Sequence, residues 1–426
     1  VRRNGAWRFA GYSLDTLEGD VVAVERWSDV PMTTRQLLST TEELYVSIAS
    51  DLGATPVPGT RFVIYPSDDT LRAVARPTSD ERVGWLVASP QYAEIAWGEP
   101  ITPAVVSLVL NQMGLPQDEG TWLREGLALR FESGIAEASL PTLSSVEGVT
   151  PWTNSSTTGE AVDEDGAAMR AYSWSASEYL LSQYGRKGLR ALCEAWGREG
   201  RDSAFEEALG ISLPHFEGDW HDEWIEPLRA TAAGIRATLD DREASVLDRD
   251  QEKFLSTVTM SDSVLRSEER HRFAALIDRP VLTYSLDAEI IGWTPASSHT
   301  TVILQATTEI SGGDSSAVAY DAHFVREDEE WRYADSVWHE LANEDLILKY
   351  QSDDMAWAEH ILAQTERVYD QVTADLGAFP ALPQEIKLYG NEETFRASIG
   401  PSLPQRTKLW PAEGASIKLW LDSRSD

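Results

Sequence analysis

Residues 121–132 read Thr-Trp-Leu-Arg-Glu-Gly-Leu-Ala-Leu-Arg-Phe-Glu, and the interpretation of the first half of the chain depends on this stretch. Thr121 is a favourable helix cap, and the apolar residues that follow recur at helical spacing, which predicts a helix over 122–132. A second helix is predicted just before it. It opens near Pro103, a residue tolerated in a first turn, and ends at Met113 before Gly114.

The segments on either side alternate between helical and strand patterns. Before the helix pair, the spacing of apolar residues predicts a helix over 33–53 that ends at Gly53, a short helix over 71–75, and strands at 61–65, 85–89 and 92–97. After it, 138–166 is rich in Ser, Thr, Gly and acidic residues and is expected to be a long surface loop. A helical pattern then runs over 169–236, with breaks expected at Gly185, Gly197, Gly210 and Pro214.

The period changes from helical to strand-like in the next hundred residues. Helices are predicted over 241–257 and 261–276, and strands at 281–286, 300–305, 317–324 and 331–333, with a hairpin turn at Asp328-Glu329. Helices followed by an antiparallel sheet give an α+β fold class.

The chain repeats itself at an offset of 324 positions. Val1–Ala10 reads VRRNGAWRFA and Val325–Ala334 reads VREDEEWRYA, and the correspondence continues from Asp51-Leu-Gly53 to Asp375-Leu-Gly377 and from Tyr65 to Tyr389. We therefore expect one unit of a tandem array that begins inside one domain and stops inside another.

Composition excludes several classes of protein. A formal charge of −34 disfavours nucleic acid, and no apolar run is long enough for a membrane span. The single cysteine, Cys193, rules out a disulfide framework and lies among apolar neighbours, as expected of a buried, unreactive thiol.

The 121–132 stretch resembles the helix that supplies the third zinc ligand in gluzincin (peptidase MA-like) metallopeptidases. Gln183–Leu192, Phe205–Ser212 and Phe216–Trp220 are similar to the helical subdomain of that family. The resemblance covers about 30–235 and again 350–426. It implies a zincin-like domain, with a mixed sheet and a helical subdomain, and places Glu125 at the third-ligand position.

The zinc motif of the family is missing. It requires His-Glu-x-x-His on the preceding helix, because two imidazoles one turn apart hold Zn²⁺ and the glutamate activates water. In our preferred register Pro103 and Ser107 occupy the histidine positions and Ala104 the glutamate position, and every histidine of the chain lies after residue 214. Glu125 alone cannot hold zinc, so we expect no catalytic residue and no metal or cofactor in this stretch. Glu125 is then either a vestigial ligand position or a surface carboxylate paired with Arg124 or Arg130.

The helix-and-sheet segment after it resembles the cystatin-like cone fold of the ketosteroid isomerase and nuclear transport factor superfamily. The expected domains follow from these two resemblances: the C-terminal end of a preceding cone-fold domain (1–29), a gluzincin-like domain with its zinc motif lost (30–238), a cone-fold domain with a curved antiparallel sheet (239–350), and the N-terminal part of a second gluzincin-like domain (351–426).

Three functions stay open from the sequence. The first is a catalytically silent metallopeptidase-like domain in a tandem-repeat bacterial protein, acting as a scaffold or binding a substrate or partner, with a protein or peptide as the partner class. The second is part of an active zinc metallopeptidase, whose His-Glu-x-x-His would fall in the second copy beyond residue 426. The third is a small-ligand site in the cone-fold domain, which would need a deep apolar pocket. The acidic composition is consistent with an extracellular or cell-surface protein.

Overall fold

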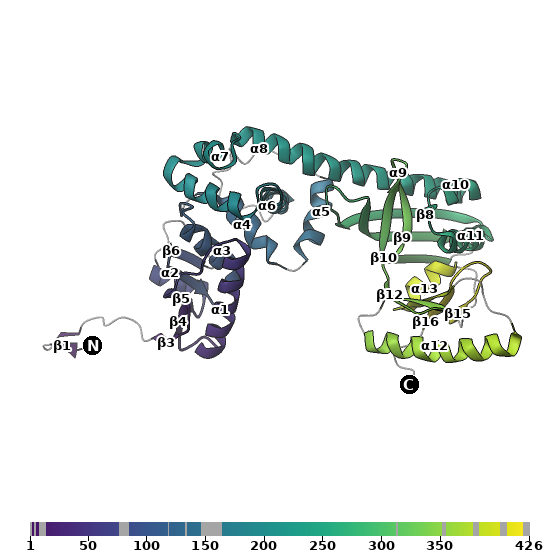
Figure 1. Cartoon of the computed structure of the whole chain (residues 1–426), viewed down its shortest axis with the longest axis horizontal. Helices are drawn as coiled ribbons and strands as arrows, with labels where there is room; N and C mark the ends of the chain where they lie inside the picture. Colours follow the sequence, from purple (N-terminus) through teal and green to yellow (C-terminus); the bar gives the residue numbers. More distant parts are fainter. Residues whose placement is uncertain are drawn as a thin grey trace. The chain divides into compact units, whose positions relative to one another are not determined.

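A computed structural model describes residues 2–3, 6–7, 14–75, 85–117, 119–132, 134–145, 164–311, 314–351, 355–377, 383–400 and 407–420. The chain forms two compact units, Val1–Glu226 and Pro227–Asp426, which are described separately. Both units combine helices with sheet, so the α+β class is confirmed at this level (Figure 1).

Unit 1 is built on a five-stranded mixed sheet, which we call the first sheet. Its central strands are parallel and its two edge strands are antiparallel to their neighbours. In spatial order the strands are β3 (Leu14–Glu18), β4 (Val22–Trp27), β5 (Thr60–Tyr65), β7 (Tyr92–Ala96) and β6 (Trp85–Ser89).

Helices cover both faces of the first sheet. On one face, α1 (Thr34–Asp51) packs its buried Tyr45 against Phe62 of β5, and α3 (Ile101–Gln112) lies against β6 and β7. On the other face, α2 (Asp68–Ala75) packs Leu71 against Val63 and Tyr65. A Thr33–Gln36 capping box fixes the start of α1.

The remaining helices of unit 1 form an all-helical part. They are α4 (Thr121–Arg130), α5 (Ile135–Ser145), α6 (Glu164–Glu199), α7 (Arg201–Leu209), α8 (Leu213–Trp220) and the π-helical turn η2 (His221–Ile225). The closest crossing is between α4 and α6, where a Cβ on Gly126 would lie 2.0 Å from the carbonyl oxygen of Ser173. Ser173 and Ser177 are fully buried on the side of α6 that meets Gly126, so small side chains let the two helices approach.

Two predictions for this part are wrong. Part of the predicted loop over 138–166 is helix α5, which contains Pro141 and packs against α6; residues 146–163 lie outside the described residues. Gly197 does not break α6. A Cβ there would lie 2.3 Å from the carbonyl oxygen of Gly114, so this glycine allows a close approach of two segments. The break at Gly185 is confirmed, with φ 63° and ψ −174°.

Unit 2 begins with a helix-and-sheet block, residues 227–336. Its helices are α9 (Glu226–Asp248), α10 (Gln251–Ser256) and α11 (Ser263–Ile277). Its antiparallel sheet has the order β11 (Glu330–Ser336), β10 (Asp314–Glu327), β9 (His299–Ile310), β8 (Val281–Gly292). The turn predicted at Asp328-Glu329 is confirmed, with both residues at positive φ. The helix predicted to start at 241 instead begins at 226, so the expected domain boundary at 238/239 falls inside α9.

Unit 2 also contains a second five-stranded sheet with the strand order of the first. The strands are β12 (His339–Ala342), β13 (Leu346–Tyr350), β14 (Gln384–Tyr389), β16 (Ile417–Trp420) and β15 (Leu409–Trp410), accompanied by α12 (Met355–Leu376) and α13 (Glu392–Ile399). The 324-residue offset of the sequence relates the two sheets, since β5 at 60–65 corresponds to β14 at 384–389. The short hairpin β1 (Arg2–Arg3) and β2 (Ala6–Trp7) pairs Arg2 with Trp7, just as β10 and β11 pair Arg326 with Trp331.

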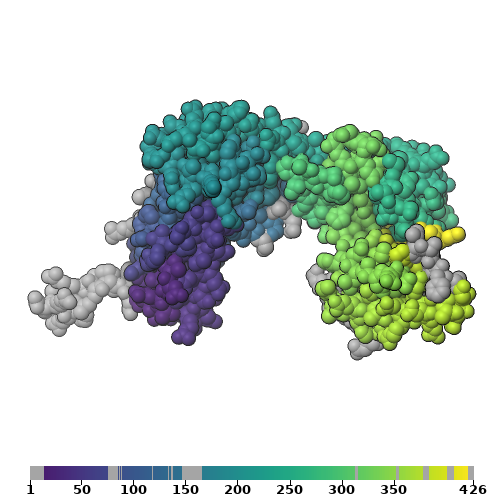
Figure 2. Space-filling model, viewed as in Figure 1, coloured from purple at the N-terminus to yellow at the C-terminus, as the bar shows by residue number. Residues whose placement is uncertain are grey.

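Helix α12 forms an outer surface of unit 2 (Figure 2). Its Val372 and Leu376 are 48% and 73% exposed, whereas Ile48 and Leu52, their counterparts at and just after the end of α1, are fully buried. These corresponding apolar side chains are thus buried in unit 1 and exposed to solvent in unit 2.

Candidate functional site

Helices α3 and α4, which carry the four positions compared with the zinc motif (Pro103, Ala104, Ser107 and Glu125), are neighbours, as the sequence predicts. The four positions differ in burial. Ala104 and Ser107 are buried within α3, and the Ser107 hydroxyl has no hydrogen-bond partner in the described part of the chain. Pro103 is half-buried, and Glu125 projects from an exposed position of α4.

The contact between α3 and α4 is made by a buried arginine. The Arg124 guanidinium donates to the carbonyl oxygen of Ser107 at 3.0 Å and to Oδ1 of Asn111 at 2.7 Å, both on α3. It also donates to the carbonyl oxygens of Pro116 and Glu119 in the connecting segment. A cation that satisfies four acceptors holds the two helices and their connection together.

The two arginines expected beside Glu125 also bind other groups. Arg130 pairs with Asp51 and Glu178, and Arg124 binds the acceptors above. A pairing of either arginine with Glu125 stays a prediction. Burial by the surrounding helices raises the pKa of the Glu125 carboxyl, although the residue keeps an exposed edge, and the charge of Arg170 opposes the rise.

These residues do not fit a zinc ion. A catalytic zinc needs three protein ligands, and the four positions offer one carboxylate, a proline, an alanine and a serine. Within the described residues no group of three or more His, Cys, Asp or Glu side chains is placed to hold a metal. We therefore derive no chemical step through zinc at this place.

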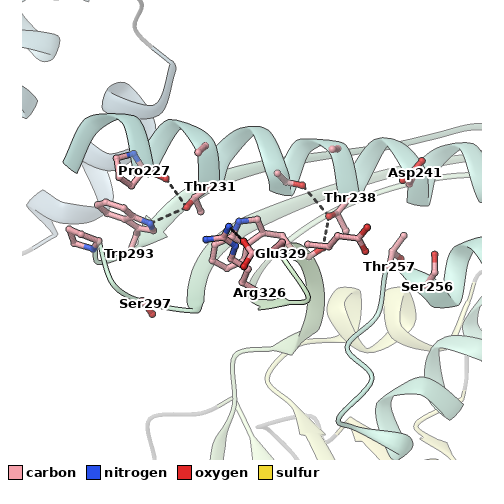
Figure 3. Close-up of a pocket in the computed structure, with 16 residues that line it drawn as sticks. Pro227, Thr231, Thr238, Asp241, Ser256, Thr257, Trp293, Ser297, Arg326 and Glu329 are labelled. Carbon is pink, nitrogen blue, oxygen red and sulfur yellow. Dashed lines mark hydrogen bonds and ion pairs between the residues drawn. The ribbon is translucent and has the colours of Figure 1, made fainter. Parts of the chain in front are cut away.

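A groove of about 470 Å³ lies along α9 in the helix-and-sheet block (Figure 3). Figure 3 shows Trp293 and Thr231 pointing toward each other, with the indole N–H donating to the Thr231 hydroxyl at 3.2 Å. Thr238 donates to the carbonyl oxygen of Trp331, whose ring packs so closely on Gly234 that a Cβ there would lie 2.5 Å away. Both indoles are more than nine-tenths buried and hold the block together, so they offer no open face for a ligand to stack on.

The interior of this block is filled by charged and aromatic side chains. Arg242 lies 4.1 Å from the ring centre of Phe254 and pairs with Glu269, which also pairs with Arg272 at 3.4 Å. Tyr333 stacks on the other side of Arg242, at 4.9 Å. The small-ligand hypothesis stays a prediction, and the groove along α9 has polar lining residues, among them Thr231, Asp241 and Glu330.

A second buried charge cluster lies between α11 and the second sheet, and no motif pointed to it. Lys387 of β14, fully buried, donates to Glu268 of α11 at 2.8 Å and to Asp335 of β11 at 2.6 Å. Lys418 of β16 lies 3.2 Å from Glu268, which also accepts hydrogen bonds from the backbone N–H and hydroxyl of Ser416. Two lysines therefore balance two carboxylates in a largely buried contact.

The lysines and carboxylates of this cluster keep one another ionised. Burial alone would raise the pKa of Glu268, but Lys418 and Lys387 lower it to about 2. Burial would likewise lower the pKa of Lys387, yet Asp335 and Glu268 raise it well above its usual value. Each group stays ionised because removing one charge would leave its partners buried and unpaired.

None of the described helices has the length and apolar composition to cross a membrane. No protein-family model matches the chain, and a search of curated proteins found no match.

Proposed function

We propose that unit 1 is a catalytically silent metallopeptidase-like domain in a tandem-repeat protein, and that it acts as a scaffold and partner-binding module. The family is proposed from the resemblance of 121–132 to the helix that carries the third zinc ligand in gluzincins. The loss of catalysis is proposed from the residues at the positions of the zinc motif. Zinc hydrolases need a metal-bound water and a carboxylate base. Ala104 has no carboxylate to act as that base.

The observation that carries the proposal is the contact at Arg124. A buried guanidinium bonded to the Ser107 carbonyl joins the two helices whose counterparts would share a metal in an active enzyme. A fixed positive charge close to this position also disfavours a divalent cation.

The experiment measures zinc and activity in the same preparation. The full chain is incubated with Zn²⁺, dialysed, and assayed for metal by mass spectrometry and for hydrolysis of an unfolded protein substrate. We expect no stoichiometric zinc and no hydrolysis. One retained zinc per chain that is lost on Glu125→Gln would contradict the proposal. The exposed His215 and His221 make His215→Ala/His221→Ala the control for loosely bound metal.

A further inference from the structure

The two sheets present corresponding faces with opposite charges. We define the charged face of the first sheet as Glu25, Arg61, Val63, Tyr92 and Glu94, and that of the second sheet as Lys349, Glu385, Lys387, Ser416 and Lys418. Each pair of residues is 324 positions apart, and the strand pairings place Val63 beside Glu94 as they place Lys387 beside Lys418.

The sign of the charge is reversed at three corresponding positions. Glu25 pairs with Arg61 across β4 and β5, whereas Lys349 pairs with Glu385 across β13 and β14 at 2.9 Å. The third position is Glu94, where the second sheet has Lys418. Because both members of the Glu25–Arg61 pair are exchanged for residues of opposite charge, an ion pair is kept. The electrostatic potential of the second face is nevertheless opposite in sign to that of the first.

In the second sheet this face is an internal contact. Lys387 and Lys418 are nearly inaccessible and meet the carboxylates of Glu268 and Asp335 in the helix-and-sheet block. The formal charges of the face are +1, −1, +1 and +1, a sum of +2, which the two carboxylates cancel.

In the first sheet the corresponding charges are not cancelled. Glu25, Arg61 and Glu94 sum to −1. Glu94 is 7% exposed and accepts hydrogen bonds from the phenols of Tyr65 at 2.8 Å and Tyr92 at 3.2 Å, but in the described ranges no cation lies within ion-pair distance of it. The Arg61 side chain is 47% exposed, against 10% for its counterpart Glu385. Arg61 is thus the open part of this face, whereas Val63 is 1% exposed and packs against Leu71 of α2. Among the described residues of unit 1 no counterpart of the helix-and-sheet block lies on the face.

Sequence of the same kind precedes both sheets. The β1–β2 hairpin has the strand register of the β10–β11 hairpin, and β10–β11 belongs to the block that covers the second sheet. In the repeat, a five-stranded sheet thus follows strands like those of the helix-and-sheet block.

We propose that the charged face of the first sheet docks a domain built like residues 227–336, whose helix corresponding to α11 carries a lysine or arginine at the position of Glu268. One positive charge there neutralises the face. A second copy of this chain does not fit, because its Glu268 would meet Glu94 in a buried contact. The inference rests on the binding role proposed for unit 1 and not on the loss of zinc chemistry. Bound zinc would therefore contradict the proposed function alone, and failure of the tests below would contradict this inference alone.

The first test recodes the second sheet with the charges of the first. The substitutions are Lys349→Glu, Glu385→Arg and Lys418→Glu, which leave the Lys387–Asp335 pair in place. We expect the melting temperature of unit 2 to fall by about 10 °C, and the addition of Glu268→Lys to recover at least half of that loss. In the natural chain Glu268→Lys alone should lower the melting temperature. Failure of Glu268→Lys to rescue the recoded chain would overturn the proposal.

The second test is association between molecules. In the Glu268→Lys chain, α11 repels its own sheet and complements Glu94 of a neighbouring molecule, so sedimentation should show concentration-dependent association. Adding Glu94→Lys should abolish it. Association that is unchanged by Glu94→Lys, or no association by a Glu268→Lys chain with native circular dichroism, would overturn the proposal. If that chain does not fold, the rescue experiment decides.

Discussion

At the residue scale, unit 2 depends on lysines that are almost completely buried. Lys387 is fully buried and its ammonium group reaches carboxylates from α11 and β11, so one side chain connects the second sheet with the helix-and-sheet block. Ion pairs at the surface contribute little because water screens them, whereas a buried charge that loses its partner is costly.

The first prediction concerns this lysine. Lys387→Met should destabilise unit 2 by about 3–5 kcal/mol, because Glu268 and Asp335 are left buried with fewer compensating charges. Chemical denaturation followed by tryptophan fluorescence measures the loss. The matched control is Lys253→Met, which removes an exposed lysine paired with Asp241 and should leave the midpoint unchanged. Equal effects of the two substitutions would show that burial does not matter here.

The second prediction concerns pH. The pKa of Glu268 is about 2 in the folded chain and 4.5 as its ordinary value, so its carboxylate stabilises the fold above about pH 4.5. That stabilisation is lost as the pH falls toward about 2, at about 1.4 kcal/mol per pKa unit. Denaturation at a series of pH values should show this slope in the wild type and a flatter one in Glu268→Gln. An identical slope in both chains would contradict the assignment.

At the element scale, the helical part of unit 1 depends on how closely helices can approach. Gly126 faces the backbone of α6, and the buried Ser173 and Ser177 lie on the opposite side of the contact. The sequence showed Gly126 as part of the Glu-Gly-Leu-Ala motif, but it did not show which helix Gly126 contacts. The structure shows that a larger side chain at this position would collide with α6.

The third prediction tests this crossing. Gly126→Ala should destabilise unit 1 by about 3 kcal/mol or more, since the new methyl would lie 2.0 Å from a backbone oxygen and α4 must move. Gly218→Ala is the control in α8, because nothing lies within 4 Å of its Cβ position and alanine favours a helix. Thermal unfolding should show opposite shifts for the two variants. A neutral Gly126→Ala would mean that the helices are farther apart than described.

The sequence predicted these elements unevenly for physical reasons. Alternating and helical periods located β5, β6 and β7 of the first sheet, the antiparallel sheet of the helix-and-sheet block and the helix that ends near Gly53, because their core faces are continuous. Strands β3 and β4 were not predicted, because residues 1–29 were assigned to the end of a preceding domain. Helix α5 was missed since Pro141 and several serines lower its intrinsic propensity, and packing against α6 compensates. Gly197 was misjudged as a break because a glycine that permits a close contact looks the same in sequence as one that ends a helix.

At the scale of the whole molecule, the chain is two compact units with their own cores. Of the site, sequence reasoning could locate the altered motif positions on adjacent helices. It could not locate the buried cluster of Glu268, Asp335, Lys387 and Lys418, because these residues come from separate elements and follow no local pattern. Only the pairing of strands brings such side chains together.

The fourth prediction follows from the two cores. Calorimetry should resolve two unfolding transitions, since independent domains unfold separately. Gly126→Ala should lower one, Lys387→Met should lower the other, and the double variant should show both shifts added. A single transition that moves with either substitution would show that the units unfold as one.

The reversed ion pairs of the two sheets have a consequence for folding. Two similar sheets in one chain could exchange strands before either is complete, which is a known hazard of repetitive proteins. If β5 were inserted beside β13, Arg61 would face Lys349, and if β14 were inserted beside β4, Glu385 would face Glu25. Like charges in adjacent strands repel, so each strand recognises its own neighbour. A change at one member of either pair removes an attraction between neighbouring strands, whereas an exchange of both members keeps it.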